Sequence, residues 1–118
     1  MNWGWEEVVL EVLKKIMKII NDKGGENPVV LDMRRTPIPT EYFVIVTANS
    51  YTHMRAMRDE LIDFIKSSGI PIIYYDRGDQ YEWLLIDIGD IVIHIFTEKG
   101  REFYDLEGLW FDAERVRL

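Results

Sequence analysis

Cysteine is absent from the 118-residue sequence, which excludes disulfide bonds, thiolate catalysis and cysteine metal ligands. Histidine occurs only twice, at His53 and His94, in different predicted elements. A zinc site needs roughly three or four Cys, His or carboxylate ligands, so we expect no metal site and no cofactor. No apolar run reaches the ~20 residues that cross a membrane, and the start MNWGWEE lacks the basic residues of a signal peptide. We therefore expect a cytoplasmic protein without membrane attachment.

The excess of acid over base is concentrated in one part of the chain. The net charge is −7, from 21 acidic and 14 basic residues. Residues 74–114 hold 11 acids against Arg77, Lys99 and Arg101, whereas residues 1–73 are nearly balanced. Nucleic-acid binding needs Lys and Arg to neutralise phosphates, so we expect no direct, sequence-specific contact with nucleic acid. An acidic segment suits a basic protein partner, although acidity also aids solubility by itself.

The hydrophobic content of 47% excludes a disordered chain, and the length allows one domain with its own core. A helix is predicted over residues 3–23, where apolar residues recur at helical spacing: Val8, Val12, Ile16, Ile19 and Ile20. A second helix is predicted over residues 51–68, capped by Asn49 or Ser50 and ended by Gly69. Its predicted buried stripe comprises Met54, Met57, Leu61, Phe64 and Ile65.

Strands are predicted at residues 29–33, 42–47 and 71–75, and a hairpin follows within WLLIDIGDIVIHIF, residues 83–96. A short helix is expected over residues 99–104. The order is helix, strand, strand, helix, three strands, helix. It predicts a single α/β domain with a mixed β-sheet of about five strands and helices packed on it.

The hairpin carries polar side chains in an otherwise aliphatic stretch. A two-residue Gly89-Asp90 loop of type II′ pairs Ile88 with Ile91 and so fixes the register of both arms. One face is then entirely aliphatic and must lie beneath a helix: Leu84, Ile86, Ile88, Ile91, Ile93 and Ile95. The other face, called the mixed face below, pairs Trp83 with Phe96, Leu85 with His94, and Asp87 with Val92.

The mixed face, in which Asp87 and His94 are diagonal neighbours, has two interpretations. It is either an interface centred on a tryptophan whose N–H has a partner, or a smaller core layer with one Asp–His hydrogen bond. Catalysis is not indicated, because Asp87 and Asp90 lie on opposite sides of a turn and no glycine-rich loop precedes a helix. No serine lies in a nucleophile elbow. We expect no catalytic residue.

Three stretches, YFVIVTANSYTHMRAM, WLLIDIGDIVIHIF and REFYDLEGLW, occur in an order and spacing that resemble the ribosomal silencing factor family, also called the Iojap family. The resemblance covers about residues 29–113. Its most specific part is the Gly-Asp turn followed by three Ile or Val residues and a His, and later by F-Y-x-L-E-x-L-W. By this resemblance the chain divides into an N-terminal helix and turn (1–27), a family core (28–113) and a tail (114–118).

The resemblance implies a fold like that of nucleotidyltransferases but without their active site, with Asn49-Ser50 where a Gly-Ser would stand. It implies that the chain binds the large ribosomal subunit through large-subunit ribosomal protein fourteen, blocks subunit joining and represses translation. A diverged, metal-dependent nucleotidyltransferase-like enzyme is the alternative. We also expect a homodimer of the free protein, because the mixed face exposes Trp83 and Phe96 unless something covers them.

Trp83 is the expected anchor of the partner-binding surface, because it matches the tryptophan that opens the family's hairpin. The expected partner-binding residues are Glu82, Trp83, Leu85, Asp87, His94, Phe96, Tyr104, Leu106, Glu107, Leu109 and Trp110. The chain departs from the family at RRTPIPTEYF, where members often carry a serine-rich loop, and at Y-Y-D-R-G, where many have V-E-G. These departures involve residues 35–41 and 75–79.

Overall fold

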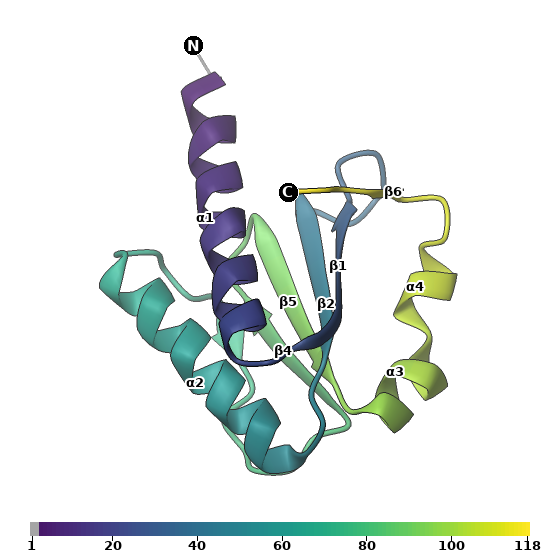
Figure 1. The fold of residues 1–118 in the computed structure, drawn as a ribbon. Helices are drawn as coiled ribbons and strands as arrows, with labels where there is room; N and C mark the ends of the chain where they lie inside the picture. The colour runs from purple at the N-terminus through teal and green to yellow at the C-terminus, as the bar shows by residue number, and fades with distance from the viewer. Residues whose placement is uncertain (1–2) are drawn as a thin grey trace.

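The structure is a computed structural model that describes residues 3–118 (Figure 1). Within these residues the helices are α1 (Trp3–Asp22), α2 (Tyr51–Ser67), α3 (Glu98–Tyr104) and α4 (Leu106–Leu109). The strands are β1 (Glu26–Asp32), β2 (Tyr42–Thr47), β3 (Tyr74–Tyr75), β4 (Trp83–Asp87), β5 (Ile91–Phe96) and β6 (Glu114–Arg115). None of the helices in this part of the chain is long and apolar enough to cross a membrane.

The strands form one mixed sheet in the order β3-β4-β5-β2-β1-β6. The central pair, β2 and β5, is parallel, and the other neighbouring pairs are antiparallel. The predicted α/β fold is confirmed, but the sheet has six strands instead of about five, because residues 114–115 of the tail pair with β1. The third strand is shorter than predicted, because β4 ends at Asp87, opposite Tyr74. Ile73 still donates its N–H to the carbonyl of Asp87 at 2.9 Å.

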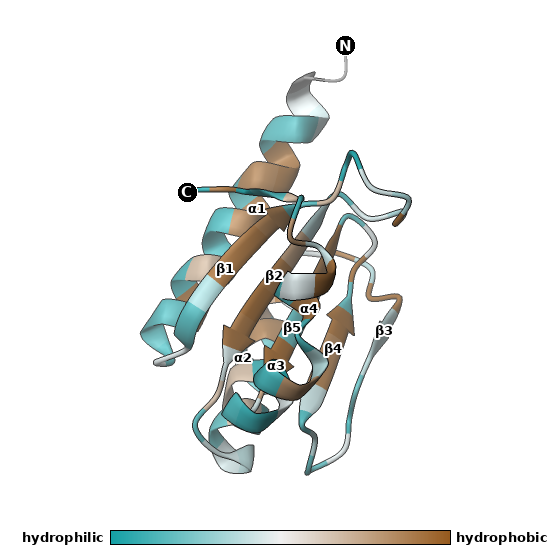
Figure 2. Cartoon of the chain, turned by 90° about the vertical axis from the view of Figure 1, so that its right-hand side faces the viewer, coloured by the Kyte–Doolittle hydropathy of each residue, from teal (hydrophilic) through white to brown (hydrophobic). Residues whose placement is uncertain are grey.

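Helices cover both faces of the sheet. α1 and α2 pack together on one face, and α3 and α4 lie on the other (Figures 1 and 2). The strands between them are largely hydrophobic, as Figure 2 shows. The larger core lies beneath α1 and α2 and includes the aliphatic face of the hairpin, as predicted. A smaller core lies on the side of α3 and α4 and contains Leu31, Met33, Phe43, Ile45, Val92, Phe96 and Leu106.

The buried stripe of α1 is displaced from the predicted one. Val8 is 52% exposed and Val12 is half-buried. The buried residues are Val9, Leu13, Ile16 and Ile20. Both stripes have helical spacing, so the sequence periodicity does not distinguish between them. Packing against the sheet and α2 decides which stripe faces inward.

The ends of α2 and most of its buried stripe agree with the prediction. The hydroxyl of Ser50 accepts from the N–H of His53 at 3.0 Å and so caps the helix. Gly69 follows the helix with a φ of 72°, in the left-handed region that glycine adopts without strain. Phe64 is half-buried, and Arg58 is buried instead. Its guanidinium donates to the carbonyl oxygens of Asp76 and Gly78 and thereby holds the loop before β4.

The hairpin of β4 and β5 has the predicted register. Trp83 lies opposite Phe96, and the pairing continues to Asp87 opposite Val92. The N–H of Ile88 donates to the carbonyl of Ile91 at 3.1 Å, and Gly89 has a φ of 91°. A positive φ at the first loop residue is what a type II′ turn requires. The mixed face lies on the same side of the sheet as α3 and α4, because Val92 and Phe96 share the smaller core with Leu106 of α4.

Candidate functional site

Most of the mixed face is a second core layer. His94 is 3% exposed and Phe96 is fully buried. Phe96 belongs to the smaller core on the side of α3 and α4, and the ring of His94 lies against Phe43 of the same core. Leu106, at the start of α4, is also buried and packs into this layer. The chain itself covers the face, so the expected exposure of Phe96 is not found. In this conformation these three side chains present almost no surface to a partner.

Trp83, and not Asp87, is the polar partner of His94. The indole Nε1–H of Trp83 donates to Nδ1 of His94 at 3.0 Å. The carboxylate of Asp87 instead accepts from the backbone N–H of Gly89 at 2.8 Å. The predicted Asp87–His94 hydrogen bond was therefore wrong, because Asp87 is engaged in the turn next to it. Trp83 reaches His94 diagonally across the two strands.

Trp83 is also the centre of a group of aromatic rings. Its ring stacks on that of Phe96 with the centroids 5.3 Å apart, and the ring of Tyr104 lies 5.0 Å away. Trp83 is half-buried and Tyr104 is 47% exposed. These two rings therefore form the outer surface above the buried Phe96. We name Trp83 and Tyr104 the aromatic platform.

His94 is a neutral acceptor in an apolar environment. Burial lowers the pKa of His94 to about 3. Because Nδ1 accepts from Trp83, the proton of the neutral imidazole lies on Nε2. Nε2 is buried and has no hydrogen-bond partner in the described part of the chain, and the ring packs edge-on against Phe43 at 4.5 Å. His94 is therefore unsuited to act as an acid or base near neutral pH.

Glu82, next to Trp83, is engaged by contacts within the chain. Its carboxylate accepts from the hydroxyl of Thr97 and from that of Tyr51, the latter at 2.5 Å. These hydrogen bonds, that of Thr97 first, hold the pKa of Glu82 below its usual range. Thr97 also caps α3, because its hydroxyl accepts from the N–H of Gly100 at 3.0 Å. Glu82 thus connects β4 to α2 and to the start of α3.

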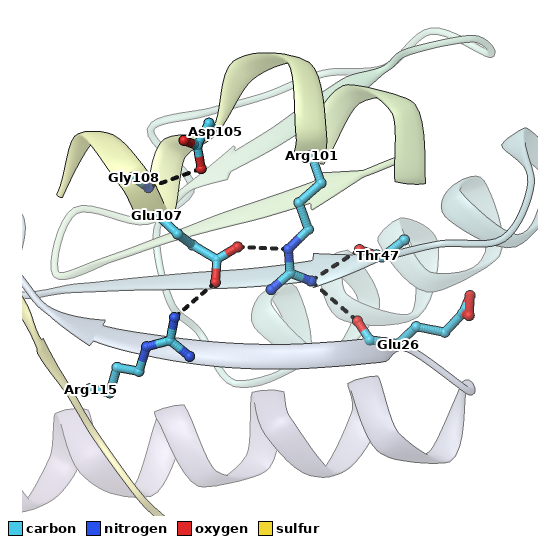
Figure 3. A network of polar contacts seen from close by, with 7 residues as sticks. All are labelled: Glu26, Thr47, Arg101, Asp105, Glu107, Gly108 and Arg115. Atoms are coloured by element: carbon cyan, nitrogen blue, oxygen red, sulfur yellow. Dashed lines mark hydrogen bonds and ion pairs between the residues drawn. The ribbon is translucent and has the colours of Figure 1, made fainter. Parts of the chain in front are cut away.

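A second polar network holds α3 and α4 to the sheet (Figure 3). Arg101 on α3 donates to the carboxylate of Glu107 at 2.8 Å and to the hydroxyl of Thr47 on β2 at 3.0 Å. Arg115 on β6 donates to the other oxygen of Glu107 at 3.3 Å. The side chain of Glu107 is only 23% exposed. Both of its oxygens are therefore already engaged in the free protein.

Asp105 forms the joint between α3 and α4. Its backbone is left-handed, with a φ of 42°, and its side chain accepts from the N–H of Gly108 at 3.1 Å. Two glycines permit the close packing around this joint. A Cβ at Gly108 would lie 2.1 Å from the carboxylate of Asp105, and a Cβ at Gly100 would lie 2.1 Å from the backbone oxygen of Glu82. The local sequence therefore allows two short helices to turn sharply and still touch the sheet.

Apolar side chains on and beside α3 and α4 are exposed to solvent. Phe103 is 78% exposed, Leu109 is 68% exposed, and Phe111, just after α4, is 83% exposed. Phe103 lies against Tyr104, with the ring centroids 5.0 Å apart, and so extends the aromatic platform. Leu109 was predicted as a partner-binding residue, but Phe103 and Phe111 were not. The only sequence signal for Phe111 is an aromatic residue in a polar stretch after Trp110.

The remaining candidate residues occupy intermediate positions. Leu85 and Trp110 are half-buried and pack against the smaller core. Asp87 is half-buried in the turn of the hairpin, where its carboxylate caps Gly89. Within residues 3–118, no group of three or more His, Asp or Glu side chains could hold a metal ion. The geometry therefore provides an aromatic and apolar surface rather than a cluster of titratable groups.

Comparison with known proteins identifies the family. Residues 6–118 match the family described as "Ribosomal silencing factor during starvation". A ribosomal silencing factor of Halalkalibacterium halodurans is 35% identical over 108 residues, which cover 92% of each chain. The Mus musculus protein "Mitochondrial assembly of ribosomal large subunit protein 1" is 36% identical over 86 residues, which are 67% of this chain and 38% of that protein. A crystal structure of a protein from Bacillus halodurans has a TM-score of 0.80 at 33% identity and covers 92% of this chain and 99% of that one. The chain belongs to the ribosomal silencing factor family.

Proposed function

We propose that this chain binds the large ribosomal subunit through large-subunit ribosomal protein fourteen, blocks the joining of the two subunits and so represses translation. Membership of the ribosomal silencing factor family supports this function, because the match extends over residues 6–118. The name of the Mus musculus relative also refers to the large ribosomal subunit. Such a protein works in the cytoplasm, among the ribosomes.

The observation that carries the proposal is the exposed surface on and beside α3 and α4. It combines the aromatic platform with three exposed apolar side chains, and together we name them the docking surface: Trp83, Tyr104, Phe103, Leu109 and Phe111. The rings of Trp83, Tyr104 and Phe103 adjoin one another, and Leu109 and Phe111 are exposed a few residues further along the chain. Exposed apolar side chains grouped in this way mark partner-binding sites. Residues 98–114 also carry six acidic residues against two basic ones. An acidic border suits the basic surface of a ribosomal protein.

Co-sedimentation with purified large subunits tests the proposal. The wild-type protein should sediment with large subunits and not with small subunits. Leu109→Ser should weaken binding while leaving the fold intact, because Leu109 is 68% exposed. Ile73→Ser is the matched control, because Ile73 is 67% exposed but lies beside the hairpin turn at Gly89, at the other end of β4 from Trp83. A wild-type protein that never sediments with large subunits would contradict the proposed function.

Two further measurements address the mechanism of repression. Isolated large-subunit ribosomal protein fourteen should bind the wild-type chain and lose affinity for Leu109→Ser in the same proportion as the whole subunit. When the protein is added to separated subunits, a sucrose gradient should show fewer joined ribosomes. Binding to the large subunit without any effect on joining would remove the second part of the proposal.

We also propose that the chain is not an enzyme. In support, Asp87 is occupied by its own turn, and His94 has a pKa of about 3 and is sealed from solvent. The alternative, a metal-dependent nucleotidyltransferase-like enzyme, requires bound ATP and Mg²⁺. Calorimetric titration with both should give no heat of binding, and micromolar binding that Asp87→Asn abolishes would support the alternative.

Self-association of the free protein is supported by the same surface. Phe103 and Phe111 are among the most exposed apolar residues of residues 3–118. A second copy that covered them would form a homodimer, for which binding to the ribosome competes. Light scattering at high protein concentration tests this, and a strict monomer would exclude it.

A further inference from the structure

Trp83 has one side-chain donor, its indole N–H, and this donor is directed at His94 at 3.0 Å. The rings of Phe96 and Tyr104 also lie near the indole, with centroids at 5.3 and 5.0 Å, and Trp83 packs against the smaller core. Stacking against such rings restrains the plane of the indole but allows it to turn over about the Cβ–Cγ bond, because this torsion has two broad minima. The hydrogen bond distinguishes between these two orientations.

His94 is well placed to hold the indole. Its backbone is paired on both sides, with Ile45 on β2 and Leu85 on β4. Its ring packs against Phe43 at 4.5 Å, which fixes the direction of the Nδ1 lone pair. The pKa of about 3 keeps Nδ1 unprotonated near neutral pH, so the acceptor is always available.

We infer that His94 is a positioning residue that holds the Trp83 indole in one orientation, so that the aromatic platform is already formed when a partner docks. This inference rests on the proposed function. A surface that is ordered before binding loses less side-chain entropy on association than one that must be ordered by the partner. His94, although buried, would therefore affect affinity without touching the partner.

The free protein provides the first test. The indole N–H signals of a nitrogen-15 labelled sample are recorded by NMR, and Trp83→Phe identifies the signal of Trp83. His94→Leu removes the acceptor, whereas His94→Asn keeps one, because Oδ1 of Asn is as many bonds from Cα as Nδ1 of His. We expect His94→Leu to shift the Trp83 signal and to speed its exchange with solvent. His94→Asn should restore both toward wild type.

Binding to purified large subunits provides the second test. His94→Leu should weaken affinity by roughly two- to tenfold, the usual effect of ordering one side chain, and chiefly through faster dissociation. His94→Asn should recover most of this loss. Ile95→Val is the control for a merely structural effect, because Ile95 is fully buried on the same strand but faces the other core. It should lower stability and leave affinity unchanged.

The possible outcomes separate this inference from the proposed function. The inference is overturned if His94→Leu leaves the Trp83 signal unchanged, or if it frees the indole without weakening binding. It is also overturned if Ile95→Val weakens binding to the same extent as His94→Leu, because stability would then account for the effect. If wild type itself does not bind large subunits while the indole signals behave as expected, the proposed function has failed, and with it the role in docking.

Discussion

Single atoms decide how closely α3 approaches the sheet. An added Cβ at Gly100 would lie 2.1 Å from the backbone oxygen of Glu82 and 2.8 Å from its carbonyl carbon. The backbone just before β4 cannot move aside as the end of a flexible side chain can. A larger residue at this position would therefore push α3 outward and strain the contact between Thr97 and Glu82.

Gly100→Ala should lower the free energy of unfolding by about 1–3 kcal/mol, measured by urea denaturation. Gly4→Ala is the matched control, because nothing lies within 4 Å of a Cβ added at Gly4 in α1. Ala also has a higher helix propensity than Gly, so this control should be neutral or stabilise by up to about 1 kcal/mol. Equal unfolding midpoints for the two variants would contradict the close approach of α3.

His94 makes the stability of the fold sensitive to acid. Its pKa is about 3 in the folded protein against an ordinary value of 6.5. Between these values the unfolded chain binds a proton that the folded chain does not, so the contribution of His94 is complete above pH 6.5 and decreases as the pH falls toward 3. The loss should approach about 1.4 kcal/mol per pH unit.

His94→Asn should remove this part of the pH dependence, because Asn does not titrate. Urea denaturation at a series of pH values between about 6.5 and 4, the range in which the unfolded histidine is protonated and the folded one is not, measures the slope for both proteins. The carboxylates are the same in the two chains, so the difference between the slopes isolates the imidazole. Identical slopes would mean that His94 is not the buried group responsible.

The elements differ in how far the sequence could predict them, and the reason is how local their determinants are. The Gly89-Asp90 turn fixes the register of β4 and β5 without reference to the rest of the fold, and every predicted pair is found. α1 carries two apolar stripes of the same spacing, so its orientation depends on what it packs against. β6 has only two residues, too few for any periodicity, and is a strand only because the edge of β1 is free to pair.

In the candidate site, too, the features set by local sequence could be predicted, and those set by packing could not. The closing aromatic motif indicated which residues gather on α3 and α4, but it could not indicate which of them face the sheet. The left-handed joint at Asp105 turns Leu106 inward and leaves Leu109 exposed, and a motif of residue types does not contain that information. The sequence also could not predict that Trp83, and not Asp87, is the hydrogen-bond partner of His94. Both residues are diagonal neighbours of His94, and the pattern of residue types does not distinguish between them.

Removal of β6 tests what this short edge strand contributes. The N–H of Val116 donates to the carbonyl of Val30 at 2.9 Å, and the side chain of Val116 packs against the larger core. Truncation after Ala113 should therefore lower the free energy of unfolding by about 1–3 kcal/mol and speed hydrogen exchange along β1. Leu118→Ser is the control, because Leu118 is 51% exposed, and it should change neither quantity. A truncated protein as stable as wild type would show that β6 is dispensable.

On the scale of the whole molecule, the uneven charge should steer the approach of a basic partner. Glu82 and Glu107 cannot test this, because both are engaged by internal hydrogen bonds and their loss would disturb the fold. Glu98 and Glu102 are exposed on α3 and suit the test better. Exposed charges at the rim of an interface act mainly on the association rate and are screened by salt.

Neutralising Glu98 and Glu102 together, as Gln, should slow association with large subunits by about two- to tenfold at low salt and flatten its salt dependence. The dissociation rate should stay unchanged. Neutralising Glu60 and Asp63 on α2 removes the same charge from the opposite face of the sheet and should have a smaller effect. Equal effects of the two pairs in stopped-flow binding would mean that net charge, and not its placement, governs the encounter.

The parallel pairing of β2 with β5 determines how this chain must fold. Tyr42 pairs with Ile91, 49 positions later, so the centre of the sheet forms only when the chain that contains α2, β3 and β4 closes into a loop between the two strands. Closing so long a loop is slow, and proteins dominated by such distant contacts fold in milliseconds to seconds. The hairpin of β4 and β5 is local and can form early.

Val44→Ala in β2 should therefore slow folding in stopped-flow experiments, whereas changes in β6 should mainly speed unfolding. The strands buried most deeply are thus among the last that the chain can bring together.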